Sequence, residues 1–261
     1  MKFTFPAARN MPFALALLLF AASSSGINAQ EKSSEKTKVA AAPVSAPGKT
    51  SVITAAMSPV ELARTAFNAQ GGEKFRNLKN MILIGSVDLY APNSTQSLTG
   101  KFGIIVAGEK LRQEVQSPIV SFQLIFDGEQ SFSSMRGMNL PPLNKFGLPV
   151  LAKFDQPGYT ATALPDKKKE RAFRLSDAEG NSTDFYVESA TGRVVRFEIF
   201  YNGLTFSFEY KSFREVDGVL VPVSFAQKLA APQGDFIAEF KVKEAKLNQD
   251  LPADAFAIPA Q

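Results

Sequence analysis

The chain of 261 residues contains no cysteine, no histidine and no tryptophan. Without cysteine it has neither a disulfide framework nor a thiolate nucleophile. Without histidine it lacks an imidazole base that titrates near neutral pH, and therefore any Ser-His-Asp arrangement. The most common ligands of zinc, copper and haem are missing for the same reason. These absences predict a protein without a metal or cofactor.

Carboxylates are the acid/base groups that remain, and they are scattered singly along the chain. Glu198, Glu209 and Glu239 occupy the polar positions of alternating segments, with basic residues nearby. That placement predicts solvated charges rather than a catalytic pair. The sequence also has no glycine-rich phosphate loop and no nucleophile elbow. We therefore predict that the protein is not an enzyme and has no catalytic residues.

The excess of positive charge is confined to the N-terminal region. The chain has 29 basic and 25 acidic residues, for a net charge of +4. Six of the basic and two of the acidic residues precede Ser58, which leaves 23 of each in residues 58–261. A balanced domain does not predict a nucleic-acid partner, because such binding requires a basic stripe on the folded surface.

The N-terminal 29 residues have the pattern of a secretory signal. Lys2 and Arg9 precede an apolar run over residues 11–22, and small residues follow as far as Ala29. The apolar run is shorter than the roughly 20 residues that a membrane-spanning helix needs. We predict a signal peptide over residues 1–29, cleaved near Ala29, and export to the periplasm. The alternative is an N-terminal anchor that is not cleaved.

Residues 30–57 are rich in Lys, Ser, Ala, Pro and Thr and contain few large apolar side chains. Such a segment cannot bury enough surface to offset its ordering entropy, so a disordered spacer is predicted. It serves either as a tether or as a tolerated tail without a function. Residues 58–261 are predicted to form one soluble domain that contacts membranes only transiently.

The domain is predicted to begin with a short helix and to continue as a sheet. Ser58, Pro59 and Glu61 form a capping-box pattern with proline at the first helical position, and Gly71-Gly72 ends the helix. A second helical turn is expected within residues 73–80. From residue 81 the apolar residues alternate with polar ones, and Asp-Gly, Thr-Gly and Asn-Gly pairs separate the alternating runs.

Ten or eleven strands are expected between residues 81 and 247, with consecutive strands adjacent in a meander. One apolar face per strand is typical of an antiparallel sheet covered on one side. The predicted fold class is therefore mainly β with few helices.

An apolar segment over residues 137–154 interrupts the strand pattern, with three prolines and two glycines, Gly137 and Gly147. It cannot be a regular strand. It is either a lid over a cavity or a plug that closes one end of the sheet. Leu148 and Leu151 are the residues predicted to contact a ligand if the segment is a lid.

Phenylalanine is abundant, with 23 residues in the chain. These side chains either fill a solid core or line an apolar pocket on a sheet face that one short helix cannot cover. A pocket of this composition would suit an acyl chain. The predicted wall residues are Phe102, Ile104, Phe122, Leu124, Phe206 and Phe208.

Arg112 lies in an alternating segment in which Leu111, Gln113 and Val115 share one face. One interpretation is an exposed arginine paired with Glu114 or a neighbouring acid. The other is an arginine at the cavity rim that binds a carbonyl of the lid or a lipid head group.

Short motifs from Pro59 to Pro259 follow one another in a recognisable order. They are Ala69-Gln70-Gly71-Gly72, Gly85, Leu111-Arg112-Gln113-Glu114, Phe126-Asp127-Gly128, Thr191-Gly192-Arg193-Val194, Tyr210 followed by residues 216–222, and the closing residues 251–259. This order resembles the LolA/LolB-like carriers and the wider group of outer-membrane lipoprotein-sorting proteins. The chain departs from the family pattern at Phe132, where a tryptophan often follows the Asp-Gly turn, and by its long spacer.

The resemblance implies a single curved antiparallel sheet, a half-open β-barrel lidded by short helices over a hydrophobic cavity. It also implies a periplasmic carrier of the acyl chains of a lipoprotein or lipid, without a cofactor. Envelope transport proteins are further candidate partners. The family's strand arginine that contacts the lid corresponds to Arg112. The alternative function is a non-catalytic envelope module that binds another protein through its sheet.

Overall fold

The computed structural model describes residues 53–54, 56–135, 141–142, 144–167, 169–232 and 234–259. The predicted signal peptide, nearly all of the predicted spacer, and residues 137–140 and 143 of the apolar segment lie outside these ranges. The helices within the described ranges are α1 (Pro59–Ala69), α2 (Glu73–Arg76) and α3 (Leu148–Leu151). The strands are β1 (Met81–Tyr90), β2 (Ser97–Ala107), β3 (Lys110–Gln116), β4 (Ser121–Phe126), β5 (Ser131–Ser133), β6 (Thr160–Ala163), β7 (Glu170–Ser176), β8 (Ser182–Glu188), β9 (Val194–Tyr201), β10 (Leu204–Val216), β11 (Val219–Ala231) and β12 (Gly234–Leu247).

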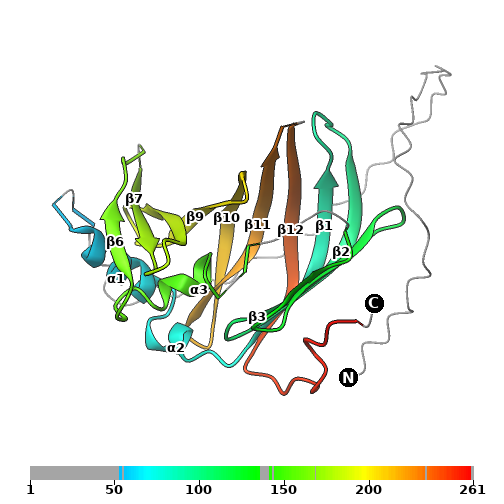
Figure 1. Ribbon diagram of the computed structural model, residues 1–261, viewed down its shortest axis with the longest axis horizontal. Helices are drawn as coiled ribbons and strands as arrows, with labels where there is room; N and C mark the ends of the chain where they lie inside the picture. The colour runs from blue at the N-terminus through cyan, green and yellow to red at the C-terminus, as the bar shows by residue number, and fades with distance from the viewer. Residues whose placement is uncertain are drawn as a thin grey trace, which may run out of the picture. The chain divides into compact units, whose positions relative to one another are not determined.

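All twelve strands in the described part of the chain belong to one antiparallel sheet (Figure 1). Its order is β5-β4-β3-β2-β1-β12-β11-β10-β9-β8-β7-β6, so two meanders meet where β1 pairs with β12. The edge strands are β5 and β6, and the sheet is open. The mainly β, antiparallel prediction is confirmed. The predicted number of strands is too low, because β5 and β6, with three and four residues, are too short to show alternation.

The connection from β5 to β6 joins the two opposite edges of the sheet. Its C-terminal part contains α3. Gly147, just before α3, faces the ring of Phe197 and the side chain of Ile199 on β9. The apolar residues after position 143 are explained by this position, since Phe146, Val150, Leu151 and Phe154 are buried against the sheet. A loop on the solvent side would not need them.

The first helix begins as the capping box predicts. The Ser58 hydroxyl accepts a hydrogen bond from the Glu61 amide at 3.3 Å, and the Glu61 carboxylate accepts one from the Ser58 amide at 2.8 Å. The buried face of α1 consists of Leu62, Ala63, Ala66 and Phe67. This face packs over β6, β7 and α3 (Figure 1).

Two clusters of buried side chains form the core. The first lies beneath α1 and α3 and is built on β7, β8, β9 and β10. The second is built on β1, β2, β11 and β12, with Phe75 of α2 and Leu78 packed against it. Phe75 and Tyr210 pack against both clusters and so connect them. No helix within the described residues has the length and hydrophobicity that crossing a bilayer requires.

A row of aromatic side chains crosses most of the sheet. The centroids of neighbouring rings in this row are 4.7–6.2 Å apart. In order along the sheet, the rings are those of Phe102, Phe240, Phe225, Tyr210, Phe197, Phe185 and Phe173. Strand β1 has no ring in this row. It contributes Gly85, which pairs with Phe102 on the neighbouring strand β2.

Replacing Gly85 tests the importance of this gap in the row. A Cβ atom on Gly85 would overlap the Lys241 carbonyl oxygen and lie 2.9 Å from the Phe102 ring. We expect Gly85→Ala to lower the free energy of unfolding by about 1–3 kcal/mol, as overpacked sites do, measured by urea denaturation. The matched control is Gly103→Ala on β2, because a Cβ there meets nothing within 4 Å. Equal stability of the two variants would contradict the conclusion that Gly85 occupies a position with no room for a Cβ atom.

Replacing Leu151 tests whether α3 is a plug. Leu151 is fully buried in the first core cluster, whereas Leu148 is only partly buried. We expect Leu151→Ala to lower the free energy of unfolding by about 2–5 kcal/mol, and Leu148→Ala to lower it less. A mobile lid would give the opposite pattern, with little change in stability and a large change in ligand affinity.

Candidate functional site

The inner face of the sheet holds a cavity of about 440 Å³. This volume lies within the range of about 300–1,000 Å³ that is usual for small-molecule sites. The walls come from both meanders, β1–β5 on one side and β9–β12 on the other. The lining is dominated by aliphatic and aromatic side chains: Leu89, Leu98, Ile104, Leu111, Val120, Phe122, Leu124, Ile199, Phe206, Phe208, Leu229 and Phe236.

Alternation and register explain why these residues point inward. On β11, Gln227 and Leu229 follow Phe225 at intervals of two residues, so they share its face of the sheet. On β12, Ala238 and Phe236 pair with Gln227 and Leu229. The cavity thus continues from the aromatic row along these strands. Its open end includes Leu98 and Phe236, which are 38% and 40% exposed.

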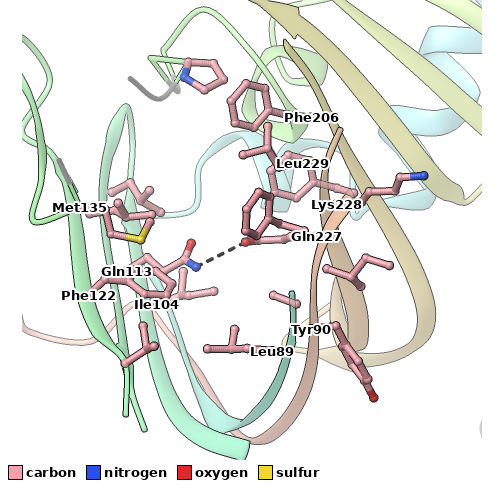
Figure 2. Close-up of a pocket in the computed structure, with 18 of the residues that line it drawn as sticks. Leu89, Tyr90, Ile104, Gln113, Phe122, Met135, Phe206, Gln227, Lys228 and Leu229 are labelled. Carbon is pink, nitrogen blue, oxygen red and sulfur yellow. Dashed lines mark hydrogen bonds between the residues drawn. The ribbon is translucent and has the colours of Figure 1, made fainter. Parts of the chain in front are cut away.

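Two glutamines bring polar atoms into this apolar cavity. Gln113 on β3 and Gln227 on β11 face each other, and Gln113 Nε2 donates to Gln227 Oε1 at 3.4 Å (Figure 2). In the strand order β3-β2-β1-β12-β11 they are four strand spacings apart, which is about 19 Å in a flat sheet. Their contact shows how strongly the sheet curves around the cavity.

Charged groups near the cavity are turned away from it. Lys228 is the one charged residue among the described lining residues, and its Nζ lies 2.6 Å from a carboxylate oxygen of Asp235. Asp88 on β1 accepts a hydrogen bond from the Thr99 hydroxyl at 2.7 Å, which lowers the pKa of its carboxyl group. Burial raises the pKa of the Tyr210 hydroxyl above its ordinary value, so this side chain is neutral at physiological pH. The described lining residues are mostly apolar, and no acid/base pair is found among them.

Five of the predicted wall residues line the cavity: Ile104, Phe122, Leu124, Phe206 and Phe208. The sixth, Phe102, does not. It is only 3% exposed and is covered by Phe225 and Phe240, so it belongs to the second core cluster. The alternation placed Phe102 on the correct face, but the rings that cover it come from strands more than 100 residues later in the chain.

The two residues predicted to form a lid, Leu148 and Leu151, do not line the cavity either. Both pack in or against the first core cluster, so α3 occupies the position of a plug. An earlier part of the same segment lies closer to the site, since Pro141 borders the cavity. Within the described part of the segment, Pro141 thus borders the cavity, whereas α3 lies in the core.

Arg112 lies on the face of β3 opposite to Gln113. Its Nε donates to a Glu114 carboxylate oxygen at 2.7 Å, and its Nη1 donates to the Ala255 carbonyl oxygen at 3.2 Å. This matches the interpretation of Arg112 as an arginine paired with Glu114. For the other interpretation, a rim residue, the structure shows that Arg112 is not among the residues lining the cavity and that the backbone carbonyl it binds belongs to the C-terminal segment.

Several lining residues were not predicted from the sequence. Leu89 and Leu98 share the alternating pattern of β1 and β2 and pair with each other. Phe236 and Ala238 share that of β12, and Met135 follows β5. The pattern alone could identify their inward phase. It could not identify the pairing of β1 with β12, which brings them together.

Arg112→Ala is expected to loosen the C-terminal segment and to leave the cavity unchanged. Loss of a hydrogen bond from a charged group predicts cleavage by chymotrypsin at Phe256 that is roughly two- to tenfold faster, measured by mass spectrometry. Arg214→Ala, at an exposed arginine on β10, is the control. Unchanged cleavage combined with altered ligand binding would support the rim interpretation instead.

The sequence matches no protein-family model and no curated protein. Several solved structures are similar in fold. A DUF1329 family protein from Desulfovibrio piger has a TM-score of 0.50 at 9% identity, over 77% of this chain and 98% of that chain. A LolA superfamily protein from Nitrosomonas europaea has a TM-score of 0.49 at 14% identity, over 78% and 99%. A domain assigned to outer membrane lipoprotein-sorting proteins, from Vibrio parahaemolyticus, has a TM-score of 0.48 at 12% identity, over 76% and 96%.

At these identities the similarity concerns the fold alone. The DUF1329 family structure supports a shared fold over nearly its whole length. The architecture itself, one open antiparallel sheet with short helices, agrees with the expectation for LolA/LolB-like proteins. The chain therefore has the mainly β, open-sheet fold that its resemblance to these carriers predicts.

Proposed function

We propose that the domain is a carrier that holds an acyl chain of a lipid or lipoprotein in the cavity between its two meanders. The observation that supports this most directly is the cavity itself. Its walls are aliphatic and aromatic, and its one charged residue among the described positions is paired with Asp235. Burial of a hydrocarbon chain against such walls is favourable by roughly 25 cal/mol per Å² of apolar surface removed from water.

The proposed setting is the periplasm, in outer-membrane lipoprotein sorting or envelope lipid transport. The basic and apolar pattern of residues 1–29 supports export. A carrier in this compartment must shield an acyl chain from water between two membranes, which an apolar cavity with an open end would allow. The donor and acceptor would be envelope transport proteins or the membranes themselves. No step in this function requires a catalytic residue.

Filling the cavity tests the proposal. Ala238 lines the cavity and is small, so Ala238→Phe should occupy part of the space that a ligand needs. We expect delipidated wild-type protein to bind N-phenyl-1-naphthylamine, an uncharged fluorescent probe, in a saturable manner. The Ala238→Phe variant should bind it roughly 5- to 150-fold more weakly, which corresponds to an overlap cost of about 1–3 kcal/mol.

The matched control is Ala226→Phe, which adds the same ring on the other face of β11. Ala226 pairs with Glu239 and does not line the cavity. Its variant should bind the probe as the wild type does. Absence of saturable binding in the wild type would reject the carrier proposal and favour the alternative, an envelope module that binds another protein through its sheet.

A further inference from the structure

The glutamine pair inside the cavity has more hydrogen-bonding capacity than the protein uses. Each side-chain amide has two N–H donors and an acceptor oxygen with two lone pairs. The bond between Gln113 and Gln227 is the one hydrogen bond that either side chain makes to a described residue. At 3.4 Å it is also longer than the usual 2.9–3.0 Å, so it is weak.

The surroundings of the pair are unusual for glutamine. Gln113 is only 5% exposed, although glutamine is mostly found on protein surfaces. Gln113 Oε1 and Gln227 Nε2 make no hydrogen bond to a described residue, and neither is sealed inside the core. Both atoms are therefore open to a ligand in the cavity. Leucine at both positions would suit a site for plain hydrocarbon better, so the pair favours a ligand with a polar group.

The chemistry of the cavity indicates which polar group fits. The lining offers no unpaired cation among the described residues, because the Lys228 ammonium group is bound to Asp235. An ionised carboxylate would be buried there without a counter-charge, which is strongly unfavourable. A neutral carbonyl can accept from a glutamine N–H without such a cost, and an amide N–H or hydroxyl next to it can donate to a glutamine oxygen.

The position of the pair indicates where this group lies in the ligand. Figure 2 shows Phe206 and Leu229 on one side of the two glutamines and Leu89 on the other. We infer that Gln113 and Gln227 bind a neutral carbonyl of an acyl ester or acyl amide, with apolar parts of the ligand extending on both sides of it. This inference rests on the proposed function, and it narrows the ligand from any acyl chain to an esterified or amidated one.

Competition between ligands of similar length but with different polar groups tests the inference. Bound N-phenyl-1-naphthylamine is displaced with methyl decanoate, N-methyldecanamide, dodecane or ionised decanoate. In the wild type, the affinity for the ester, the amide or both, relative to dodecane, should exceed the ratio that their transfer from water to hydrocarbon predicts, and decanoate should bind most weakly. The ester and amide arms distinguish glycerolipid-type from N-acyl-type ligands.

Replacement of the pair should remove this preference. In the double variant Gln113→Leu/Gln227→Leu, the preference for the ester or amide over dodecane should fall by about three- to tenfold, as expected for loss of one or two hydrogen bonds. Dodecane itself should bind as well as before or better. The control is Gln116→Leu, which changes a glutamine on β3 that does not line the cavity.

The outcomes separate this inference from the proposal on which it rests. An unchanged preference in the double variant, or tightest binding of decanoate, would overturn the inference and leave the carrier proposal standing. Failure of every ligand to displace the probe from the wild type would reject both. A thermal midpoint of the double variant at or above that of the wild type would show that reduced binding is not caused by unfolding.

Discussion

Contact between aromatic rings from distant parts of the chain is the interaction on which the rest of the structure depends. The row from Phe102 to Phe173 includes rings from β2, β12, β11, β10, β9, β8 and β7. Each such pair contributes roughly 0.5–1.5 kcal/mol beyond the burial of its area. Because β1 supplies Gly85 at this level, the Phe102 ring reaches Phe240 on the far side of β1. The row therefore holds the two meanders together at their junction.

The same junction determines where the cavity forms. With β1 paired to β12, the inner face of the sheet curves until residues four strand spacings apart touch, as Gln113 and Gln227 do. Helices α1 and α3 cover the part of this face over β7–β9. Neither of them covers the part between β1–β5 and β9–β12, and it is there that the cavity lies.

The fold was more predictable from the sequence than the site was. Alternation and the Asp-Gly and Asn-Gly turns are local signals, and they gave the strands, the meanders and the start of α1 at Ser58. The wall residues Ile104, Phe122, Leu124, Phe206 and Phe208 followed from the same alternation. Whether an inward residue lines a cavity or lies under other rings depends on long-range pairing, which explains why Phe102 was assigned to the wrong group.

The alternatives that the sequence left open at Arg112 and Leu151 have a similar origin. A two-residue period tells which residues share a face, and it correctly separated Arg112 from Gln113. It does not tell which face is the inner one at a given strand, or that the C-terminal segment supplies the carbonyl that Arg112 binds. Likewise, the composition of residues 137–154 indicated an apolar segment that is not a strand, but not that Leu151 lies in the core beneath α1.

The chain that connects the two edges of the sheet also sets a mechanical limit. Separating β5 from β6 would stretch the connection between them, and Leu151 anchors that connection in the first core cluster. The covalent connection therefore limits how far the two edges can move apart, because separation beyond its length would require Leu151 to leave the core.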